Sequence, residues 1–485
     1  MTERSMAPRA ARILSWALPL GLTIIAALLR IVGVGGPATL LFDETYYVKD
    51  AWTLWNLGYE GTWGDDPNAA FEAGDVNGYT DTGSFVAHPP LGKWIIGVGM
   101  ALFGTGPFGW RIATALVGTL LVPLLYVVAK RLTGSLWLAT VAGALIAIDP
   151  LAVAMSRIAL LDSSLALFVL LAFWFVLLDR TGTVARIRAS TDAIAGPTIW
   201  RRPWILAAGA ALGLASAVKW SGLYALAVLG IAIVVMDAID RRRAGVGRWV
   251  EAAIGRQGPV SFVLLVPPAL AVYLAAWTGW FATDGGYDRD SSSNPFTALW
   301  NYHRTVLSFH ETVTSGHTYA SPAAEWIPML NPTLMQRTTE DDGGVGLMAA
   351  LPNPVLWWAA VVAVVWVAVR IFIALANKRP ISGTDGFLLA GICATYAPWL
   401  LLPSRTMFTF YAITVLPFAI LAVVVLAARL RARDDPERAA VARAATSTAL
   451  IAILLVGLFF LPFGTGWVEP EWLYKAHLWL PSWYL

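Results

Sequence analysis

The sequence contains few charged residues and almost no cysteine. Asp, Glu, Lys and Arg together make up 13% of the 485 residues, whereas soluble domains carry roughly a quarter. This deficit excludes an ordinary soluble enzyme. Cys393 is the single cysteine, so a disulfide framework is excluded as well. The sequence also lacks internal repeats and a small-residue cleavage site after its first apolar run, so we expect that run to remain in the protein as a helix.

Long apolar blocks are what the sequence does contain. Apolar residues make up 58% of the chain, and they recur in blocks close to the length of about 17–25 residues that crosses a bilayer. We therefore predict an all-α polytopic membrane protein with about eleven transmembrane helices. The predicted spans are 13–34, 111–129, 135–153, 160–178, 204–217, 220–236, 260–281, 355–376, 387–403, 408–427 and 446–463.

Basic residues are distributed unevenly between the two sides of the predicted bundle. With the N-terminus inside, the inner segments carry about twice as many Lys and Arg residues as the outer ones. The positive-inside rule therefore predicts a cytoplasmic N-terminus, and an odd number of spans places the C-terminus outside. All five histidines then lie on the outer side.

Two outer segments, 35–110 and 282–354, are long, and we treat the whole chain, 1–485, as one transmembrane domain. Both segments are rich in Trp, Tyr, Gly, Asp and His. Within the first, residues 93–104 are apolar but too few to span a bilayer, which predicts a helix lying along the membrane surface. The second is long for a structureless connection, so we expect it to be functional or partly helical.

The stretch LFDETYYVKD (41–50) places two carboxylates, Asp43 and Glu44, just beyond the first apolar run. Carboxylates in the first turn of a helix suit the helix dipole, so the pair is consistent with the start of a surface helix. Alternatively, one carboxylate is a general base at the boundary between water and lipid. Position alone leaves both interpretations open.

Basic residues near the outer ends of predicted spans are candidate ligands of an anion. Lys93 follows two prolines in AHPPLGKW, Lys219 separates two short apolar blocks, and Arg405 precedes an aromatic cluster. Arg157 and Asp162 flank a further outer junction and could form an ion pair there. Arginine suits a phosphate because its planar fork binds two oxygens. Alternatively, each of these side chains could have a structural role, either by extending its charged end to the water at the membrane interface or by pairing with a carboxylate.

Three histidines recur every seven residues within the second long segment. His303, His310 and His317 would share one face of a straight helix. However, the HExxH spacing of a zinc site is missing, and Gly316 is expected to break the helix. We therefore expect these histidines to bind substrate rather than a metal.

Together these stretches resemble the protein O-mannosyltransferases, which are membrane glycosyltransferases of the GT-C architecture. The resemblance runs in order through FDETYYVKDAW, HPPLGKW, SRIALLD, SAVKWSGL, the YHxxxLxFHxxxxxxHxYxS pattern from Tyr302 to Ser321, and FYAITVLPF. It covers most of the chain. Eukaryotic relatives carry a β-trefoil MIR domain in the second long segment, which is too short for one here, so the resemblance implies the compact bacterial form.

The resemblance implies a polyprenyl phosphate mannose donor and a Ser or Thr hydroxyl acceptor in a secreted protein. It maps the family's acidic motif onto Asp43, as catalytic base, and Glu44, as support for the acceptor or the site geometry. Charge and position make Arg157, Lys219 and Arg405 candidates for the donor phosphate, with Lys93 as a further one. The remaining residues that we expect to bind substrate are His88, Asp162, Tyr302, His303, His310 and His317.

The expected setting is a bacterial plasma membrane with the active site on its outer face. Membrane lipids and the secretion channel are expected partners, and a nucleic acid is not. Some GT-C relatives use a divalent metal, but the sequence offers no ligand set for one, so no cofactor is implied.

Two other functions are compatible with parts of the pattern. One is a GT-C transferase that acts on a lipid or a cell-wall glycan. The HPPLGK and histidine-rich segments disfavour this alternative. The other is a transporter. Transporters place ionisable groups and broken helices near the midplane and often contain inverted repeats, whereas here the ionisable residues gather at the outer ends of the spans.

Overall fold

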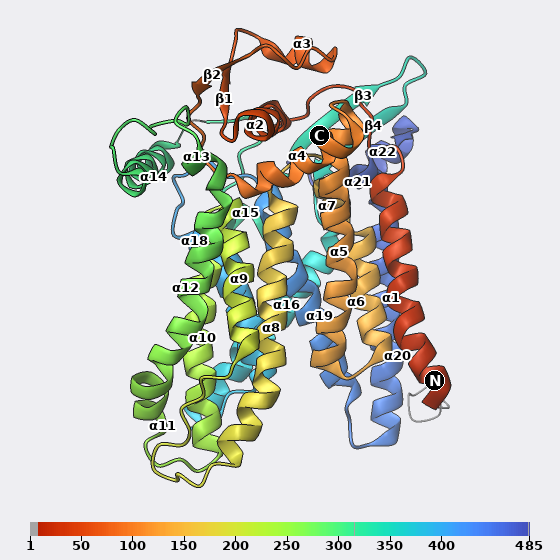
Figure 1. Cartoon of the computed structure of the whole chain (residues 1–485). Coiled ribbons are helices and arrows are strands. Elements are labelled where there is room, and N and C mark those ends of the chain that lie inside the picture. The colour runs from red at the N-terminus through yellow and green to blue at the C-terminus, as the bar shows by residue number, and fades with distance from the viewer. Residues whose placement is uncertain (1–7, 315, 484) are drawn as a thin grey trace.

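The protein is a bundle of long helices with a smaller layer over one end. The computed structural model describes residues 8–314, 316–483 and 485. In Figure 1 the long helices stand side by side, and the C-terminus lies in the layer that covers their upper end. The N-terminus lies at the opposite end. We refer to these two ends as the capped end and the N-terminal end.

Among the described residues, seven helical segments are long and apolar enough to cross a membrane. An eighth crossing results if α6 and α7, which are bent by 52° relative to each other, form one span. The bend falls where Pro150 begins α7, because proline cannot donate the hydrogen bond that would continue α6. The crossing elements are α1 (Pro8–Ile31), α5 (Pro107–Thr133), α6 (Leu136–Ile148), α7 (Pro150–Arg157), α8 (Asp162–Arg188), α10 (Ser221–Arg243), α11 (Trp249–Glu251) with the π-helix η2 (Ala252–Gln257) and α12 (Gly258–Ala276), α16 (Pro354–Ala376) and α20 (Pro436–Phe459).

Three predicted spans fall on shorter helices. The span predicted at 204–217 is α9 (Pro203–Val218), that at 387–403 is α17 (Gly383–Thr395) with α18 (Ala397–Leu400), and that at 408–427 is the 3-10 helix η3 (Thr409–Thr414) with α19 (Leu416–Arg431). The predicted multi-pass helical architecture is confirmed. The number of eleven spans stays a prediction, because length and composition support seven or eight.

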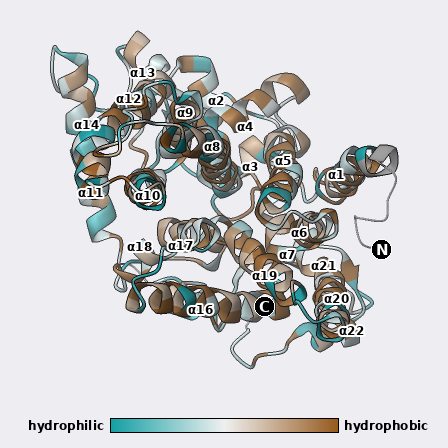
Figure 2. Ribbon diagram, turned by 90° about the horizontal axis from the view of Figure 1, so that it is seen from below, coloured by the Kyte–Doolittle hydropathy of each residue, from teal (hydrophilic) through white to brown (hydrophobic). Residues whose placement is uncertain are grey.

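Close packing inside the bundle depends on small residues. A Cβ at Gly209 or Gly213 of α9 would lie 2.3 or 2.4 Å from a backbone carbonyl oxygen of α12. Glycine therefore lets α9 and α12 approach backbone to backbone, as is common between membrane helices. Figure 2, which looks along the helices, shows α8, α17 and α19 near the middle of the bundle and α1 at its edge.

The first part of the cap is formed between α1 and α5. It consists of α2 (Glu44–Leu57), β1 (Gly61–Trp63), α3 (Pro67–Glu72), β2 (Tyr79–Gly83) and α4 (Leu91–Phe103). The strands β1 and β2 are antiparallel. α4 corresponds to the surface helix predicted at 93–104, and it lies across the capped end of the bundle in Figure 1.

The second part of the cap comes from later in the chain. Its strands β3, β4 and β5 form an antiparallel sheet in that order, so the C-terminal segment is joined to the second long segment. Its elements are α13 (Thr278–Ala282), α14 (Pro295–Thr312), α15 (Ala323–Trp326), β3 (Thr333–Thr339), β4 (Val345–Ala350), α21 (Leu461–Thr465), β5 (Val468–Glu469) and α22 (Glu471–His477).

Candidate active site

A cavity of about 110 Å³ lies at the capped end, where α8 and α10 begin. Polar and aromatic side chains line it, although they come from parts of the chain far apart in sequence. The lining residues are His88, Asp162, Leu165, Lys219, Trp220, Ser221, Tyr224, Leu307, His310, Trp399, Arg405, Tyr411 and Thr414. The structure thus brings together five of the predicted site residues, namely His88, Asp162, Lys219, His310 and Arg405.

Lys219 and Asp162 form a buried ion pair in the wall of this cavity. Lys219 Nζ lies 2.7 Å from Asp162 Oδ2. Lys219 has an extended backbone between α9 and α10, and this break in the helices lets its side chain reach the start of α8. The ammonium also lies 5.1 Å from the ring centre of Tyr411, within the range of a cation–π contact. Asp162 therefore compensates a cation that would be costly to bury alone.

Two histidines line the cavity in neutral form. The rings of His88 and His310 are stacked with their centres 5.7 Å apart. Burial, together with the charges of Lys219 and Arg405, lowers the pKa of His88 well below its usual value. Burial and the nearby Arg405 lower the pKa of His310 to about 4. At neutral pH the positive charge in the cavity therefore comes from Lys219 and Arg405.

Several nitrogen atoms around the cavity are buried but have no hydrogen-bond partner within the part of the chain that the structure describes. They are Nδ1 of His88, Nδ1 of His310 and Nε of Arg405. A buried polar atom without a partner costs about 1–3 kcal/mol. A polar ligand that bonded to these atoms would remove that cost, so the cavity is suited to a hydrogen-bonding, anionic guest.

Asp43 lies beside the cavity rather than on its lining. It is the last residue before α2, and its Oδ2 accepts a hydrogen bond from the Tyr47 hydroxyl at 3.5 Å. Burial raises the pKa of Asp43 to about 6, an effect that the positive charge of Lys219 opposes. Tyr47 in turn packs 6.1 Å from the His88 ring, centre to centre. Asp43 is therefore a mostly ionised carboxylate at neutral pH, placed within the electrostatic reach of the Lys219 cation.

Glu44, the adjacent carboxylate, has a different environment. It is fully buried and forms a double hydrogen bond with Arg111 of α5, from Nε at 2.8 Å and from Nη2 at 2.7 Å. The backbone N–H groups of Leu41 and Ala159 also donate to it, at 2.8 and 2.7 Å. Glu44 thereby ties the start of α2 to α5 and to the α7–α8 connection, and so fixes where Asp43 stands.

Arg157 does not line the cavity, although the sequence placed it among the phosphate ligands. Its Nη1 donates to the carbonyl oxygens of Leu29 and Val32, at 2.9 and 2.8 Å. These carbonyls lie at the C-terminal end of α1, where helix carbonyls lack partners within the helix. Arg157 therefore closes this helix end, and the structure does not bring it to the other cations.

Lys93 and Tyr302 hold the segment that carries His88. Lys93 is buried, pairs with Glu60 and donates to the carbonyl oxygen of His88 at 3.1 Å. The Tyr302 hydroxyl bonds to both the N–H and the C=O of Val86, each at 3.1 Å. Neither side chain lines the cavity. The proline-rich stretch is thus fixed from two sides.

The three regularly spaced histidines do not form one cluster. α14 ends at Thr312, so His317 lies beyond the helix, where its ring contacts those of Phe42 and Phe408. His303 bonds to the Tyr273 hydroxyl and lines an apolar groove of about 410 Å³ between α10, α12 and α14. Within the described ranges, no group of three or more His, Cys, Asp or Glu side chains is placed to hold a metal ion.

Sequence reasoning missed several residues that build this site. Arg111 is the partner of Glu44, and its signal was an arginine close to the start of an apolar helix, a costly position unless the charge is paired. The aromatic side chains of Tyr224 and Trp399 line the cavity. From the sequence they could not be distinguished from the aromatic residues common at membrane interfaces.

Comparison with known proteins agrees with this architecture. Residues 21–239 match the family described as dolichyl-phosphate-mannose-protein mannosyltransferase. Residues 295–483 match the C-terminal four-helix membrane region of protein-O-mannosyltransferase. The chain is 30% identical to the polyprenol-phosphate-mannose–protein mannosyltransferase of Corynebacterium glutamicum, over 97% of this chain and 93% of the relative. It is also 30% identical to the protein of the same name from Mycolicibacterium smegmatis, over 96% and 93%.

Among solved structures, the chain is similar to the Saccharomyces cerevisiae protein O-mannosyltransferase Pmt1–Pmt2 complex bound to the sugar donor. The TM-score is 0.74 at 15% identity, and the match covers 97% of this chain and 92% of that one. At this identity the likeness concerns the fold, and it extends over nearly the whole length of both chains.

Proposed function

The chain belongs to the dolichyl-phosphate-mannose–protein mannosyltransferase family, and from this premise we propose that Asp43 is the base that activates its acceptor. The chain is a multi-pass membrane enzyme of the GT-C fold that transfers mannose from polyprenol-phosphate mannose to protein. The observation that carries the role of Asp43 is its position beside a cavity that contains Lys219 and Arg405.

The proposed reaction is a single displacement at the sugar. The oxygen of a Ser or Thr hydroxyl attacks the anomeric carbon of mannose, and the bond from that carbon to the phosphate oxygen breaks. The electron pair of that bond leaves with the polyprenyl phosphate, and the hydroxyl proton passes to the Asp43 carboxylate. Phosphate is a good leaving group, so a second carboxylate acting as acid is not required, unlike in most glycoside hydrolases. Attack opposite the leaving group inverts the anomeric configuration.

The environment of Asp43 suits a general base. A base works best when its pKa lies near the working pH, because it is then both ionised and basic. Burial raises the pKa of Asp43 to about 6, closer to neutrality than that of an ordinary aspartate. The Tyr47 hydroxyl holds the carboxylate through Oδ2. Glu44 is excluded from this role because Arg111 and two backbone N–H groups already occupy its oxygens.

Lys219 and Arg405 are proposed to bind the donor phosphate. Charge that develops on the leaving phosphate is stabilised best by cations fixed in a water-poor site. Asp162 fixes the Lys219 ammonium, and Arg405 is held through a hydrogen bond from its Nη1 to the carbonyl oxygen of His310, at 3.3 Å. Arg157 and Lys93 are outside this proposal, because backbone carbonyls and Glu60 engage their charged groups.

The apolar groove beside the cavity is proposed to hold the start of the polyprenyl chain. The groove and the cavity share Trp220 and Leu307, so a ligand could extend from one into the other. The groove is lined almost entirely by apolar atoms of α10, α12 and α14, including Leu223, Val266 and Leu270. An isoprenoid tail matches that lining.

We further propose that the capped end faces the outside of the plasma membrane. The positive-inside rule favours this orientation, because arginines such as those in the Arg241–Arg243 run lie at the N-terminal end. Acceptor segments would then reach the site from the outer aqueous phase as they leave the secretion channel, which is the proposed neighbour.

The test is a transfer assay with the full chain in lipid vesicles. Mannosyl and glucosyl polyprenyl phosphates are offered with a Thr-containing peptide, a matched Ser peptide and an Ala-substituted control. We expect mannose on the Thr and Ser peptides alone, with the anomeric configuration opposite to that of the donor. Transfer to the Ala peptide, or retention of configuration, would refute the proposed chemistry.

A further inference from the structure

We propose that the N-terminal end of the bundle contains a binding site for an anionic diacyl phospholipid, separate from the active site. Two adjoining cavities make up this site. One is apolar and lies between the helices, and the other is polar and rich in arginine. They share Arg243, Ser382 and Gly383. A phospholipid joins an apolar chain to a charged headgroup, which is the combination that these two adjoining cavities would bind.

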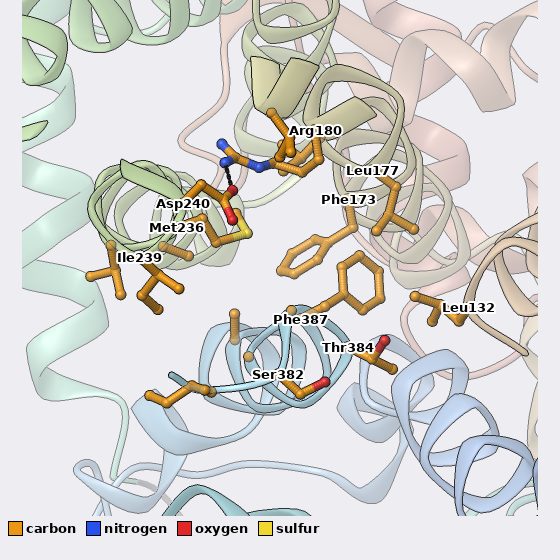
Figure 3. A pocket seen from close by; sticks show the side chains of 18 of the residues that line it. Leu132, Phe173, Leu177, Arg180, Met236, Ile239, Asp240, Ser382, Thr384 and Phe387 are labelled. Atoms are coloured by element: carbon orange, nitrogen blue, oxygen red, sulfur yellow. Dashed lines mark hydrogen bonds and ion pairs between the residues drawn. The ribbon is translucent and has the colours of Figure 1, made fainter. Parts of the chain in front are cut away.

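The apolar cavity has a volume of about 430 Å³, within the range of about 300–1,000 Å³ typical of ligand pockets. It lies between α5, α8, α10 and α17. In Figure 3 Phe173 and Phe387 lie together on its wall, with their rings edge to face and 5.3 Å between ring centres, and the apolar lining is completed by Leu177, Met236, Ile239 and Leu132. Arg180 lies at its edge, where it is paired with Asp240. The charged lining residues Arg131, Arg180, Asp240 and Arg243 come from the parts of their helices near the N-terminal end of the bundle, so the charged groups lie toward that end of the cavity.

The second cavity, of about 600 Å³, provides the cationic part of the site. Among the lining residues of the two cavities, five arginines face two aspartates: Arg131, Arg180, Arg243, Arg370 and Arg379 against Asp240 and Asp385. Asp237 and Arg429, which pair with this set, leave the excess of three positive charges unchanged. An excess of that sign matches a headgroup with a net negative charge, such as that of phosphatidylglycerol, rather than a zwitterionic one whose phosphodiester is balanced by an ammonium.

Two of these arginines retain donors for a ligand. Arg243 uses Nη2 on the Ile381 carbonyl oxygen at 2.6 Å, and its Nη1 lies 3.5 Å from Asp240 in a partly exposed pair. Arg379 lies on the polar cavity with an exposed side chain. Arginine binds phosphate oxygens through its planar fork, and basic pockets between transmembrane helices bind anionic lipid headgroups. The structure therefore assigns Arg243 and Arg379 to the headgroup.

This site is distinct from the donor cavity, which lies at the opposite end of α8 and α10. Asp162 and Lys219 mark the capped ends of these helices, whereas Arg180 and Arg243 lie close to their other ends. A lipid here would bridge α10 and α17 without contacting the reacting groups. We expect it to stabilise the folded bundle, because a ligand that binds only the folded state raises stability by mass action.

The experiment measures lipid retained by the purified full-length chain, using native mass spectrometry. Phosphatidylglycerol and phosphatidylcholine with identical acyl chains are offered at equal concentration. We expect retention of one phosphatidylglycerol, and at least about tenfold weaker retention in Arg243→Gln/Arg379→Gln, a change that corresponds to about 1.4 kcal/mol. Ala390→Phe, which places a ring in the apolar cavity without a charge change, is expected to reduce retention as well.

The matched control is Arg248→Gln/Arg256→Gln. These arginines are exposed, lie at the same end of the molecule and line neither cavity. The control is expected to retain phosphatidylglycerol as the unmodified chain does. Equal retention of the two lipids, equal loss in the two double variants, or displacement of phosphatidylglycerol by polyprenyl phosphate at equal concentration would overturn the proposal.

Discussion

The ammonium of Lys219 lies 2.7 Å from the carboxylate of Asp162, and both groups are buried in the wall of one cavity. This pair joins the α9–α10 break to the start of α8 and places a fixed cation near Asp43. The cation is the part of the site that a leaving phosphate would meet.

Replacing Lys219 separates its structural and chemical roles. Lys219→Met leaves Asp162 as an uncompensated buried charge, so we expect a loss of about 3–5 kcal/mol of stability together with loss of transfer. Lys219→Met with Asp162→Asn removes both charges and is expected to recover most of the stability but none of the activity. Thermal unfolding and the transfer assay measure the two effects. Recovery of transfer in the double variant would show that the cation is dispensable.

The pH dependence of transfer should report Asp43. The base must be ionised to accept a proton, and the pKa of Asp43 is raised to about 6. We therefore expect kcat/KM to be level above pH 7 and to fall about tenfold for each pH unit well below 6. The neutral histidines do not produce this fall, because their pKa values are lowered. A level profile down to pH 4.5 in a chain that remains folded would contradict the assignment.

Glu44 should matter for folding more than Asp43 does. Glu44→Gln leaves the buried Arg111 without its anion, and we expect a loss of about 3–5 kcal/mol and a lower yield of folded protein. Among the described residues the Asp43 side chain has one hydrogen bond, the long one from Tyr47, so Asp43→Asn should unfold at nearly the temperature of the unmodified chain. Thermal unfolding in detergent compares the two variants. Equal destabilisation would show that the neighbouring carboxylates share a structural role.

Arg405 and Arg157 should differ in their effect on the donor. Arg405→Gln removes a cation from the cavity lining, so we expect the KM for the lipid donor to rise about tenfold or more. Arg157→Gln removes hydrogen bonds to the end of α1, so its effect should be on stability, with the donor KM nearly unchanged. Initial rates at varied donor concentration distinguish the two. A larger rise in donor KM from Arg157→Gln than from Arg405→Gln would indicate that Arg157 binds the donor phosphate.

The sequence predicted the helices and much of the site because both leave local signals. Apolar blocks located each of the seven described helical segments that are long and apolar enough to cross a membrane, and the carboxylates after the first block located the start of α2. Lys219 and Arg405 stood out because charge is rare near membrane spans, and both line the cavity.

What the sequence could not supply was the direction of side chains and their distant partners. Arg157 has the same local signal as Lys219, yet its guanidinium turns toward α1. Glu44 pairs with Arg111, which lies 67 positions later in the chain. Such pairings are set by how helices pack, which a single sequence does not encode in any short pattern.

The most direct test of the central claim is the transfer rate of Asp43→Asn beside Asp65→Asn, an exposed aspartate of the same cap. Both variants are reconstituted with polyprenyl phosphate mannose and a Thr-containing peptide. A base contributes about 100- to 10,000-fold, so we expect Asp43→Asn to lose at least about 100-fold in kcat while it remains folded and binds donor. Asp65→Asn should match the unmodified chain. Transfer by Asp43→Asn within a few-fold of that control would contradict the account.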